Sequence, residues 1–442
     1  MRDGMEKGKR MPVGRKKGAE VPRRAFVNSV LVTAGAATAA GALAGYGLAE
    51  PAAGTEPAKE IVPFYGKHQA GIATRQQRNA TFLAADLASR DVATLRRLLD
   101  ELTLTAAALT RGDPPPERDS GVKGTSSLTD FGTGLSPARL TVTVGLGPAV
   151  FAIPELAARR PRHLTPLPMF DGDALNPWWC GGDVLIQICA EDPQIVSHAV
   201  RSLRARMPGL ATLRWTQYGF LSTPPDGGTP RNMFGHKDGT ANPKPGTPAF
   251  DDIVWARSPE EPEWFAGGTY LVFRKIRMKT AEWDLTPLDE QDRVIGRRRS
   301  DGAPLGASAE FDPADLTARA PDGKLVIPAD AHIRRASGMP MLRRGYTYDY
   351  GIVGGESHEH GEGTGEHGHG DGHKNHSRLD AGLLFCCYVR DPEKQFVETQ
   401  RMLAEKDRLN DFIEHTGSAI VAVPPGAREG QSLAEGLLRG LG

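Results

Sequence analysis

The segment Asn232–Pro243 carries the most specific chemical pattern in this sequence. An aspartate, Asp238, stands between Gly235 and Gly239, and Asn242 follows shortly after them. Glycine adopts backbone conformations that other residues avoid, so the chain can turn sharply here and approach a flat ligand closely. Because an Asp-Gly pair alone is typical of a solvated turn, only the whole pattern indicates a site. A carboxylate fixed on such a turn can accept and return a proton.

Imidazole groups are the other candidates for chemistry, since neutral histidine is a common metal ligand. Six of the twelve histidines lie in the Gly- and Glu-rich residues 354–377, namely His358, His360, His367, His369, His373 and His376. Their ligand type suits copper, nickel or zinc, although so much glycine predicts no preformed geometry. A hydrophilic insertion without metal is the alternative. The remaining six are His68, His163, His198, His236, His332 and His415.

The bracketed aspartate, continued by Thr-x-Asn-Pro, resembles the GxxDG signature of the dye-decolourising peroxidases. Gly66–Ile72, Gly182–Pro193 and Gly382–Tyr388 also look like that family, so the resemblance covers residues 60–425. It implies an α+β fold of two ferredoxin-like halves. Each half would have a four-stranded antiparallel sheet and peripheral helices, in a dimeric α/β-barrel-like arrangement. It also implies a haem b peroxidase that reduces hydrogen peroxide and oxidises dyes, phenols or metal-linked donors through a ferryl intermediate.

The resemblance also assigns roles to individual residues. His332, in an Ala-His-Ile-Arg segment, would be the axial ligand of the haem iron. Asp238 would move the peroxide proton, and Arg343, in a Leu-Arg-Arg-Gly-Tyr run, would stabilise charge on the leaving oxygen. Arg344 is the alternative to Arg343 because the two are adjacent. The residues expected along the haem edge are Gly239, Thr240 and Ala241.

The segment after His332 departs from the family, whose members often continue it with Asn-Pro-Arg. Here Ser337–Pro340 takes that place, so the family's propionate-binding arginine is missing. We expect Arg334 or Arg335 to bind the propionate instead. An axial imidazole also needs an acceptor for its second N–H. We expect Asp380, just before a predicted strand, to be that acceptor.

A repeated unit indicates the elements that position these residues. Each unit is a buried strand followed by a helix, at Gly182–Cys189 with Gln194–Met207 and at Gly382–Tyr388 with Glu393–Lys406. Between strand and helix stands an Asp-Pro pair, in which Asp192 or Asp391 can cap a helix that begins with proline. Further strands are expected at Ala138–Leu146 and Gly268–Met278. The pattern predicts two similar α+β halves.

Residues 1–49 have the layout of an export signal. They hold nine Lys/Arg and three Asp/Glu, and no charge occurs from Ala25 to Ala49. Arg23-Arg24 followed by apolar residues resembles a twin-arginine signal, whose pathway exports folded proteins. We therefore expect an extracytoplasmic protein, and a membrane anchor of about 20 uncharged residues is the alternative.

We expect the remaining residues to divide into a linker at 50–62, an N-terminal half at 63–225, and a C-terminal half at 226–442, which the resemblance implies would carry the haem. They contain 45 basic and 51 acidic residues, which gives no support for a nucleic-acid partner. The four cysteines form no CxxC pair, so a zinc or dithiol motif is absent from the sequence. The oligomeric state is not predicted.

Two other functions remain open. Some exported relatives have been proposed to act as deferrochelatases, which release iron from haem and spare the porphyrin. An exported copper-binding protein, or a partner of a copper-handling protein, would instead use the histidines of residues 354–377. If bulky dyes stay outside the pocket, aromatic side chains would relay electrons, although core packing is favoured for most of the candidates: Trp178, Trp179, Trp255, Trp264, Trp283, Tyr346 and Tyr388.

Overall fold

The computed structural model describes residues 60–116, 134–222, 224, 227–337, 340–353 and 378–441. The predicted export signal, the linker up to residue 59 and the histidine-rich residues 354–377 lie outside these ranges. All described residues belong to one unit, Pro57–Gly442. Among them, no helix is long and apolar enough to cross a membrane.

The N-terminal half is built on an antiparallel sheet in the order β2-β3-β1-β4. Its strands are β1 (Asn79–Leu87), β2 (Thr141–Leu146), β3 (Val184–Ala190) and β4 (Ala211–Phe220). Helices α1 (Val92–Arg111) and α2 (Pro193–Arg204) pack their buried leucines and valines into the same apolar cluster as this sheet. Asp192 accepts a hydrogen bond from the Gln194 backbone N–H at 2.7 Å, which confirms the predicted helix cap.

The C-terminal half repeats this arrangement in the order β7-β8-β5-β9. The strands are β5 (Thr269–Met278), β7 (Tyr346–Val353), β8 (Arg378–Val389) and β9 (Ile413–Val423), and the two-residue β6 (Leu342–Arg343) pairs with the end of β8. The helices are α3 (Pro248–Val254), α4 (Thr280–Asp284), α5 (Leu288–Ile295), α6 (His332–Arg335), α7 (Glu398–Lys406) and α8 (Glu435–Leu438). When the two-residue β6 is left out, the sheet order in both halves is second, third, first and fourth strand, which confirms the internal repeat.

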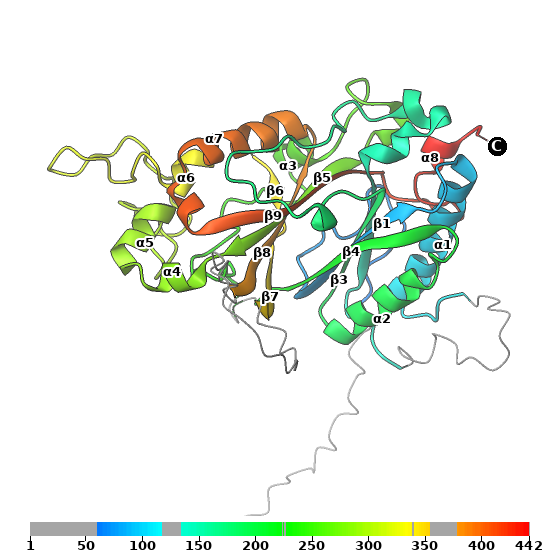
Figure 1. Ribbon diagram of the computed structural model, residues 1–442, viewed down its shortest axis with the longest axis horizontal. Helices are drawn as coiled ribbons and strands as arrows, with labels where there is room; N and C mark the ends of the chain where they lie inside the picture. Colours follow the sequence, from blue (N-terminus) through cyan, green and yellow to red (C-terminus); the bar gives the residue numbers. More distant parts are fainter. Residues whose placement is uncertain are drawn as a thin grey trace, which may run out of the picture. The chain divides into compact units, whose positions relative to one another are not determined.

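The two sheets join into a closed barrel, because they pair at both margins. Leu146 of β2 pairs with Ala422 of β9, and Phe220 of β4 pairs with Thr347 of β7. Since β5 also pairs with β8, the strands of the described residues form a closed ring, and the short β6 lies beside β8. Figure 1 shows α1 and α2 on the outside of the N-terminal strands and α7 on the outside of the C-terminal strands. The interior is filled by aromatic and aliphatic side chains from both sheets. The two ferredoxin-like halves expected from the resemblance are therefore confirmed.

The helices differ from the sequence prediction at their ends. Helix α2 ends at Arg204 rather than Met207, because Pro208 cannot extend the helix beyond the preceding turn. The second predicted helix starts as a π-helical turn, Glu393–Val397, before it continues as α7. Asp391 still accepts a hydrogen bond from the backbone N–H of Lys394, at 3.2 Å.

Most of the aromatic relay candidates are core residues. Tyr346 and Tyr388 are fully buried in the barrel interior, and Trp255 and Trp283 are also buried. Trp178 is the clear exception, because 77% of its surface is exposed. Core packing therefore accounts for the buried members, as expected for large aromatic side chains.

Candidate active site

A cavity of about 540 Å³ lies on the face of the C-terminal sheet that points away from the barrel interior. Alternate residues of each strand face opposite sides, so Ile276 and Met278 of β5 line the cavity while Phe273 fills the barrel. Helices α6 and α7 and the Asp238 loop complete its walls. Its volume lies within the range of about 300–1,000 Å³ that is common for cofactor sites.

Six of the seven predicted catalytic and cofactor-binding residues line this cavity: Asp238, Gly239, Thr240, Ala241, His332 and Arg343. The seventh, Arg334, is not among the lining residues. Its guanidinium donates to the carbonyl groups of Leu316, Ile327 and Pro328 at 2.6–2.9 Å, and so it braces the preceding loop. Arg335 also lies outside the lining residues, so neither predicted propionate anchor is placed in the cavity.

Asp238 and Arg343 form an ion pair at the cavity wall. Nη1 of Arg343 lies 3.3 Å from Oδ1 of Asp238, and each side chain is 31% exposed. Gly235 has φ of 80° and Gly239 has φ of 111°, both in the left-handed region where glycine is favoured. The sharp turn predicted around the aspartate is therefore present, and it directs the carboxylate toward the arginine.

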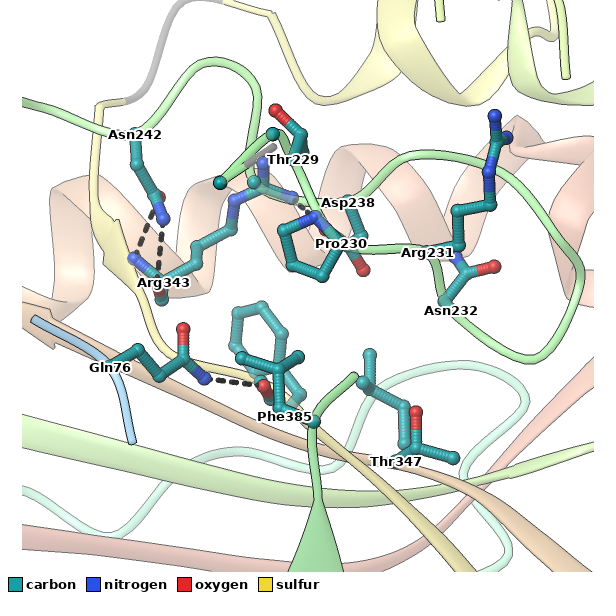
Figure 2. Close-up of a pocket in the computed structure, with 16 residues that line it drawn as sticks. Gln76, Thr229, Pro230, Arg231, Asn232, Asp238, Asn242, Arg343, Thr347 and Phe385 are labelled. Atoms are coloured by element: carbon teal, nitrogen blue, oxygen red, sulfur yellow. Dashed lines mark hydrogen bonds and ion pairs between the residues drawn. The ribbon is translucent and has the colours of Figure 1, made fainter. Parts of the chain in front are cut away.

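Asn242 fixes the position of Arg343. Its side-chain Nδ2 donates to the Arg343 carbonyl at 2.8 Å, and its Oδ1 accepts from the Arg343 N–H at 3.0 Å (Figure 2). Arg344 points the other way, since neighbouring residues of an extended chain alternate. It is buried and donates to the Ile72 carbonyl and to Oε1 of Gln77 at 3.3 and 3.1 Å. The structure thus selects Arg343 over Arg344 for the cavity.

Replacing Asn242 with alanine removes both hydrogen bonds to the Arg343 backbone. We expect kcat/KM for hydrogen peroxide to fall by about 10- to 100-fold, because a small misplacement of a catalytic group is that costly. Asn242→Asp, which keeps the acceptor and loses the donor, should show a smaller loss. Steady-state kinetics at matched haem content measures both, and unchanged kinetics for Asn242→Ala would exclude this positioning role.

His332 is the first residue of α6, and its imidazole ring is bound by a carboxylate. Its Nδ1 lies 2.6 Å from Oδ2 of Asp407, whose Oδ1 accepts from the Leu409 N–H at 2.9 Å. Burial lowers the pKa of His332, but the carboxylate of Asp407 outweighs it and holds the pKa above its ordinary value. The charge of Arg343 also lowers this pKa, and that of Asp238 raises it.

The prediction that Asp380 accepts a hydrogen bond from the His332 ring is wrong. Asp380 accepts from Nζ of Lys275 at 2.8 Å and from the hydroxyl of Tyr348 at 3.0 Å, so it belongs to a different network. Asp407 takes the role because it directly follows the last residue of α7, and α7 packs beside α6. Asp407 lies far from His332 in the sequence, and no local motif surrounds it. It could therefore not be predicted from the sequence.

Two other histidines line the cavity, and the structure distinguishes them from His332. His236 has both ring nitrogens engaged, with Asp292 at 3.0 Å and the Phe234 carbonyl at 3.4 Å. For His415, burial and then the charge of Arg274 lower the pKa to about 3. A carboxylate-bound imidazole with a free second nitrogen is the usual arrangement of a metal-ligating histidine. His332 has this arrangement.

A cationic margin lies beside the Asp238 loop. Arg297 and Lys237 both line the cavity, and both are tied to Glu310. Arg297 donates to the Glu310 carbonyl at 2.9 Å, and Lys237 is paired with its carboxylate. Thr240 donates to the same carboxylate at 2.9 Å. Arg297 and Lys237, which were not predicted from the sequence, line the cavity and would be the cations available to hold haem propionates.

The side chains that line this cavity are suited to binding a haem. An imidazole with one nitrogen held by Asp407 faces the cavity, and the Asp238–Arg343 pair stands at another part of its wall. Apolar side chains also line the cavity, including Leu383, Phe385, Leu403 and Ile413. An apolar slot with one axial ligand and a few charged groups is the type of site that haem requires.

Comparison with known proteins agrees with this site. Residues 69–221 match the model of the N-terminal domain of Dyp-type peroxidases, and residues 229–428 match the model of the C-terminal domain. The chain therefore belongs to the Dyp-type peroxidase family. It is an oxidoreductase that binds haem and acts on peroxide together with a reducing substrate.

Relatives of two kinds are similar to most of the chain. A dye-decolorizing peroxidase from Thermobifida fusca is 39% identical over 369 residues, which cover 77% of this chain and 80% of the relative. A deferrochelatase from Yersinia pestis is 36% identical over 436 residues, which cover 93% of this chain and 92% of the relative. The crystal structure of a DyP-type peroxidase from Streptomyces coelicolor matches with a TM-score of 0.75 and 37% identity, covering 86% of this chain and 98% of that chain.

Asp407 gives a test of the histidine side of the site. We expect Asp407→Asn to raise the reduction potential of the bound haem, because an amide is a weaker acceptor and makes the imidazole a weaker donor to iron. Haem affinity should fall by about 10- to 100-fold. Spectroelectrochemical titration and haem-binding titration measure these effects. Asp411→Asn, at an exposed position nearby, is the matched control, and equal potentials for both variants would contradict the assignment.

Proposed function

We propose that this chain uses haem b, bound through His332, to reduce hydrogen peroxide and oxidise dyes, phenols or metal-linked donors. The observation that carries the proposal is the ion pair of Asp238 and Arg343 in the same cavity as the His332–Asp407 pair. Haem supplies the redox-active iron when it is bound. The remaining chemistry is proton movement and charge stabilisation, which the side chains provide.

Asp238 is placed to move the proton of peroxide. Its carboxylate can accept a proton from one peroxide oxygen and return it to the other, which leaves as water when the O–O bond breaks; haem, when bound, would supply the two electrons that this cleavage requires. The guanidinium of Arg343, 3.3 Å from this carboxylate, stabilises the negative charge that develops on the leaving oxygen. Asp407 keeps the His332 ring in one orientation.

Release of iron from haem is the second candidate, supported by the deferrochelatases aligned with nearly the whole chain. One experiment separates the two functions. The protein is incubated with haem b anaerobically and assayed for metal-free porphyrin, and a second sample is assayed for peroxide-dependent oxidation of a phenol. Peroxide turnover without porphyrin supports the peroxidase. Porphyrin release without peroxide turnover would replace that proposal with the deferrochelatase.

We also propose that the protein is exported by the twin-arginine pathway after haem has been inserted. The support is the Arg23-Arg24 pair and the uncharged residues that follow it. Replacing both arginines with lysine should leave haem-loaded protein in the cytoplasm, as measured by fractionation. Export of that variant at the parental level would contradict the proposal.

The copper-binding alternative depends on residues 354–377, which lie outside the described ranges. Within the described residues, no group of three or more His, Cys, Asp or Glu side chains could hold a metal ion. Copper binding therefore remains a prediction from the sequence.

A further inference from the structure

The loop between α5 and α6 contacts the Asp238 loop on both sides of the aspartate. The carboxylate of Glu310 binds the ammonium of Lys237 through Oε2 and accepts a hydrogen bond from the Thr240 hydroxyl through Oε1, at 2.9 Å. Lys237 directly precedes Asp238, and Thr240 follows it by two residues. We propose that Glu310 is a positioning residue, which fixes the backbone that carries Asp238 and so holds its carboxylate at Arg343 (Figure 2). The inference rests on the proposed function and adds a residue to its machinery.

The turn at Asp238 needs such a restraint because it contains a flexible point. Gly239 has φ of 111°, and glycine loses more conformational freedom on ordering than any other residue. Before this glycine, the Asp238 N–H donates to the Pro230 carbonyl at 2.9 Å. After it, the Thr240 hydroxyl donates to Glu310. The backbone is therefore held on both sides of the glycine, and Asp238 lies within the restrained segment.

The side chain of Glu310 is itself presented by a fixed turn. Oδ2 of Asp312 accepts hydrogen bonds from the backbone N–H groups of Ser308 and Ala309, at 3.0 and 2.8 Å. The Glu310 carbonyl accepts a hydrogen bond from Nη1 of Arg297 at 2.9 Å. Catalytic groups keep their geometry when the residues behind them are locked by hydrogen bonds of this kind. The turn therefore gives Glu310 the rigidity that a positioning residue requires.

The contact between Glu310 and Lys237 is confined and shielded from water. Gly302 has φ of 82°, and a Cβ atom at this position would lie 2.7 Å from Cδ of Lys237, so glycine leaves room for the lysine. The Glu310 side chain is only 10% exposed. Burial raises the pKa of Glu310, but hydrogen bonds from Lys237, Thr229 and Thr240 outweigh it and hold the pKa below its ordinary value. This direction favours the ionised carboxylate that binds Lys237.

Removal of the Glu310 side chain tests this role in two backgrounds of the haem-loaded protein. With Asp238 present, Glu310→Ala should lower the second-order rate constant for reaction with hydrogen peroxide by about 10- to 100-fold, because misplacement of a catalytic group is that costly. In the Asp238→Asn background, the same change should lower it by less than about twofold, because the carboxylate that Glu310 positions is already absent. A residue that only stabilised the fold would show the same loss in both backgrounds. Stopped-flow absorbance of the haem band measures the rate constants.

Two further variants and a second readout sharpen the test. Glu310→Gln keeps an acceptor for Thr240 and loses the charge that binds Lys237, so its loss should be smaller than that of Glu310→Ala. Glu429→Ala removes an exposed glutamate that does not line the haem cavity, and its rate constant should stay at the parental value. Haem-binding titration is the second readout. Glu310 does not line the haem cavity either, so its replacement should not weaken haem binding.

Three results would overturn the inference. The first is a parental rate constant in Glu310→Ala, with folding shown by a parental Soret spectrum. The second is an equal loss in the two backgrounds, which would make Glu310 a purely structural residue. The third is a haem affinity that falls in parallel with the rate constant, which would assign Glu310 to the cofactor. If Glu310→Ala does not fold, Glu310→Gln in the same two backgrounds decides by the same comparison. Parental rates in Asp238→Asn alone would instead overturn the proposed function, whatever the effect of Glu310.

Discussion

Replacing Asp238 with asparagine should lower kcat/KM for hydrogen peroxide by about 10²–10⁴-fold, the usual contribution of a positioned acid–base group. Asparagine has nearly the same shape and can still accept a hydrogen bond from Arg343, but it cannot accept the peroxide proton. The loss should therefore occur without loss of bound haem. Steady-state peroxide kinetics, with haem quantified by its Soret band, measures the effect.

The matched control for this prediction is Asp289→Asn, at an exposed position of α5 that does not line the cavity. This variant should keep the parental kinetics. If Asp238→Asn also keeps them, the carboxylate is not the group that moves the proton, and the arginine would act alone.

Replacing Arg343 with leucine should lower kcat/KM for hydrogen peroxide by about 10²–10³-fold, as expected for loss of one donor that stabilises developing charge. The effect should appear in the reaction with peroxide and not in oxidation of the donor. Arg343→Lys should recover only part of the rate, because a lysine ammonium is a point charge without the planar donor geometry of guanidinium.

Arg319→Leu is the control for the arginine, since this exposed residue does not line the cavity. Parental kinetics in both leucine variants would remove Arg343 from the mechanism. A large loss in both would indicate that leucine disturbs the fold rather than the site. The expected pattern is a loss confined to Arg343→Leu.

Much of the fold could be predicted because its signals are local. The strands of both halves are runs of apolar residues, and each Asp-Pro pair marks the start of a helix. The closed barrel depends on single residue pairs at its margins, such as Phe220 with Thr347, which no periodicity predicts. The two-residue strand β6, which contains Arg343, cannot be predicted from the sequence either.

The site was predictable where one motif contains it, and unpredictable where the fold brings distant segments together. The turn around Asp238 requires glycine at two positive φ angles, so its sequence is diagnostic. Alternation along an extended chain predicts that Arg343 and Arg344 face opposite sides, but it does not say which faces the cavity. Asp407 and Glu310 reach the site only through the packing of α7 and of the loop between α5 and α6, so no spacing reveals them.

The most direct measurement of the central claim is a double-mutant cycle on Asp238 and Arg343. Stopped-flow absorbance of the haem band after mixing with peroxide gives the second-order rate constant for the parent, Asp238→Asn, Arg343→Leu and the double variant. If the two side chains act together in the same step, the rate constant of each single variant falls by at least about 10²-fold. The rate constant of the double variant is then at most about tenfold below that of the slower single variant. Parental rates in both single variants, or fully multiplicative losses in the double variant, would contradict the account.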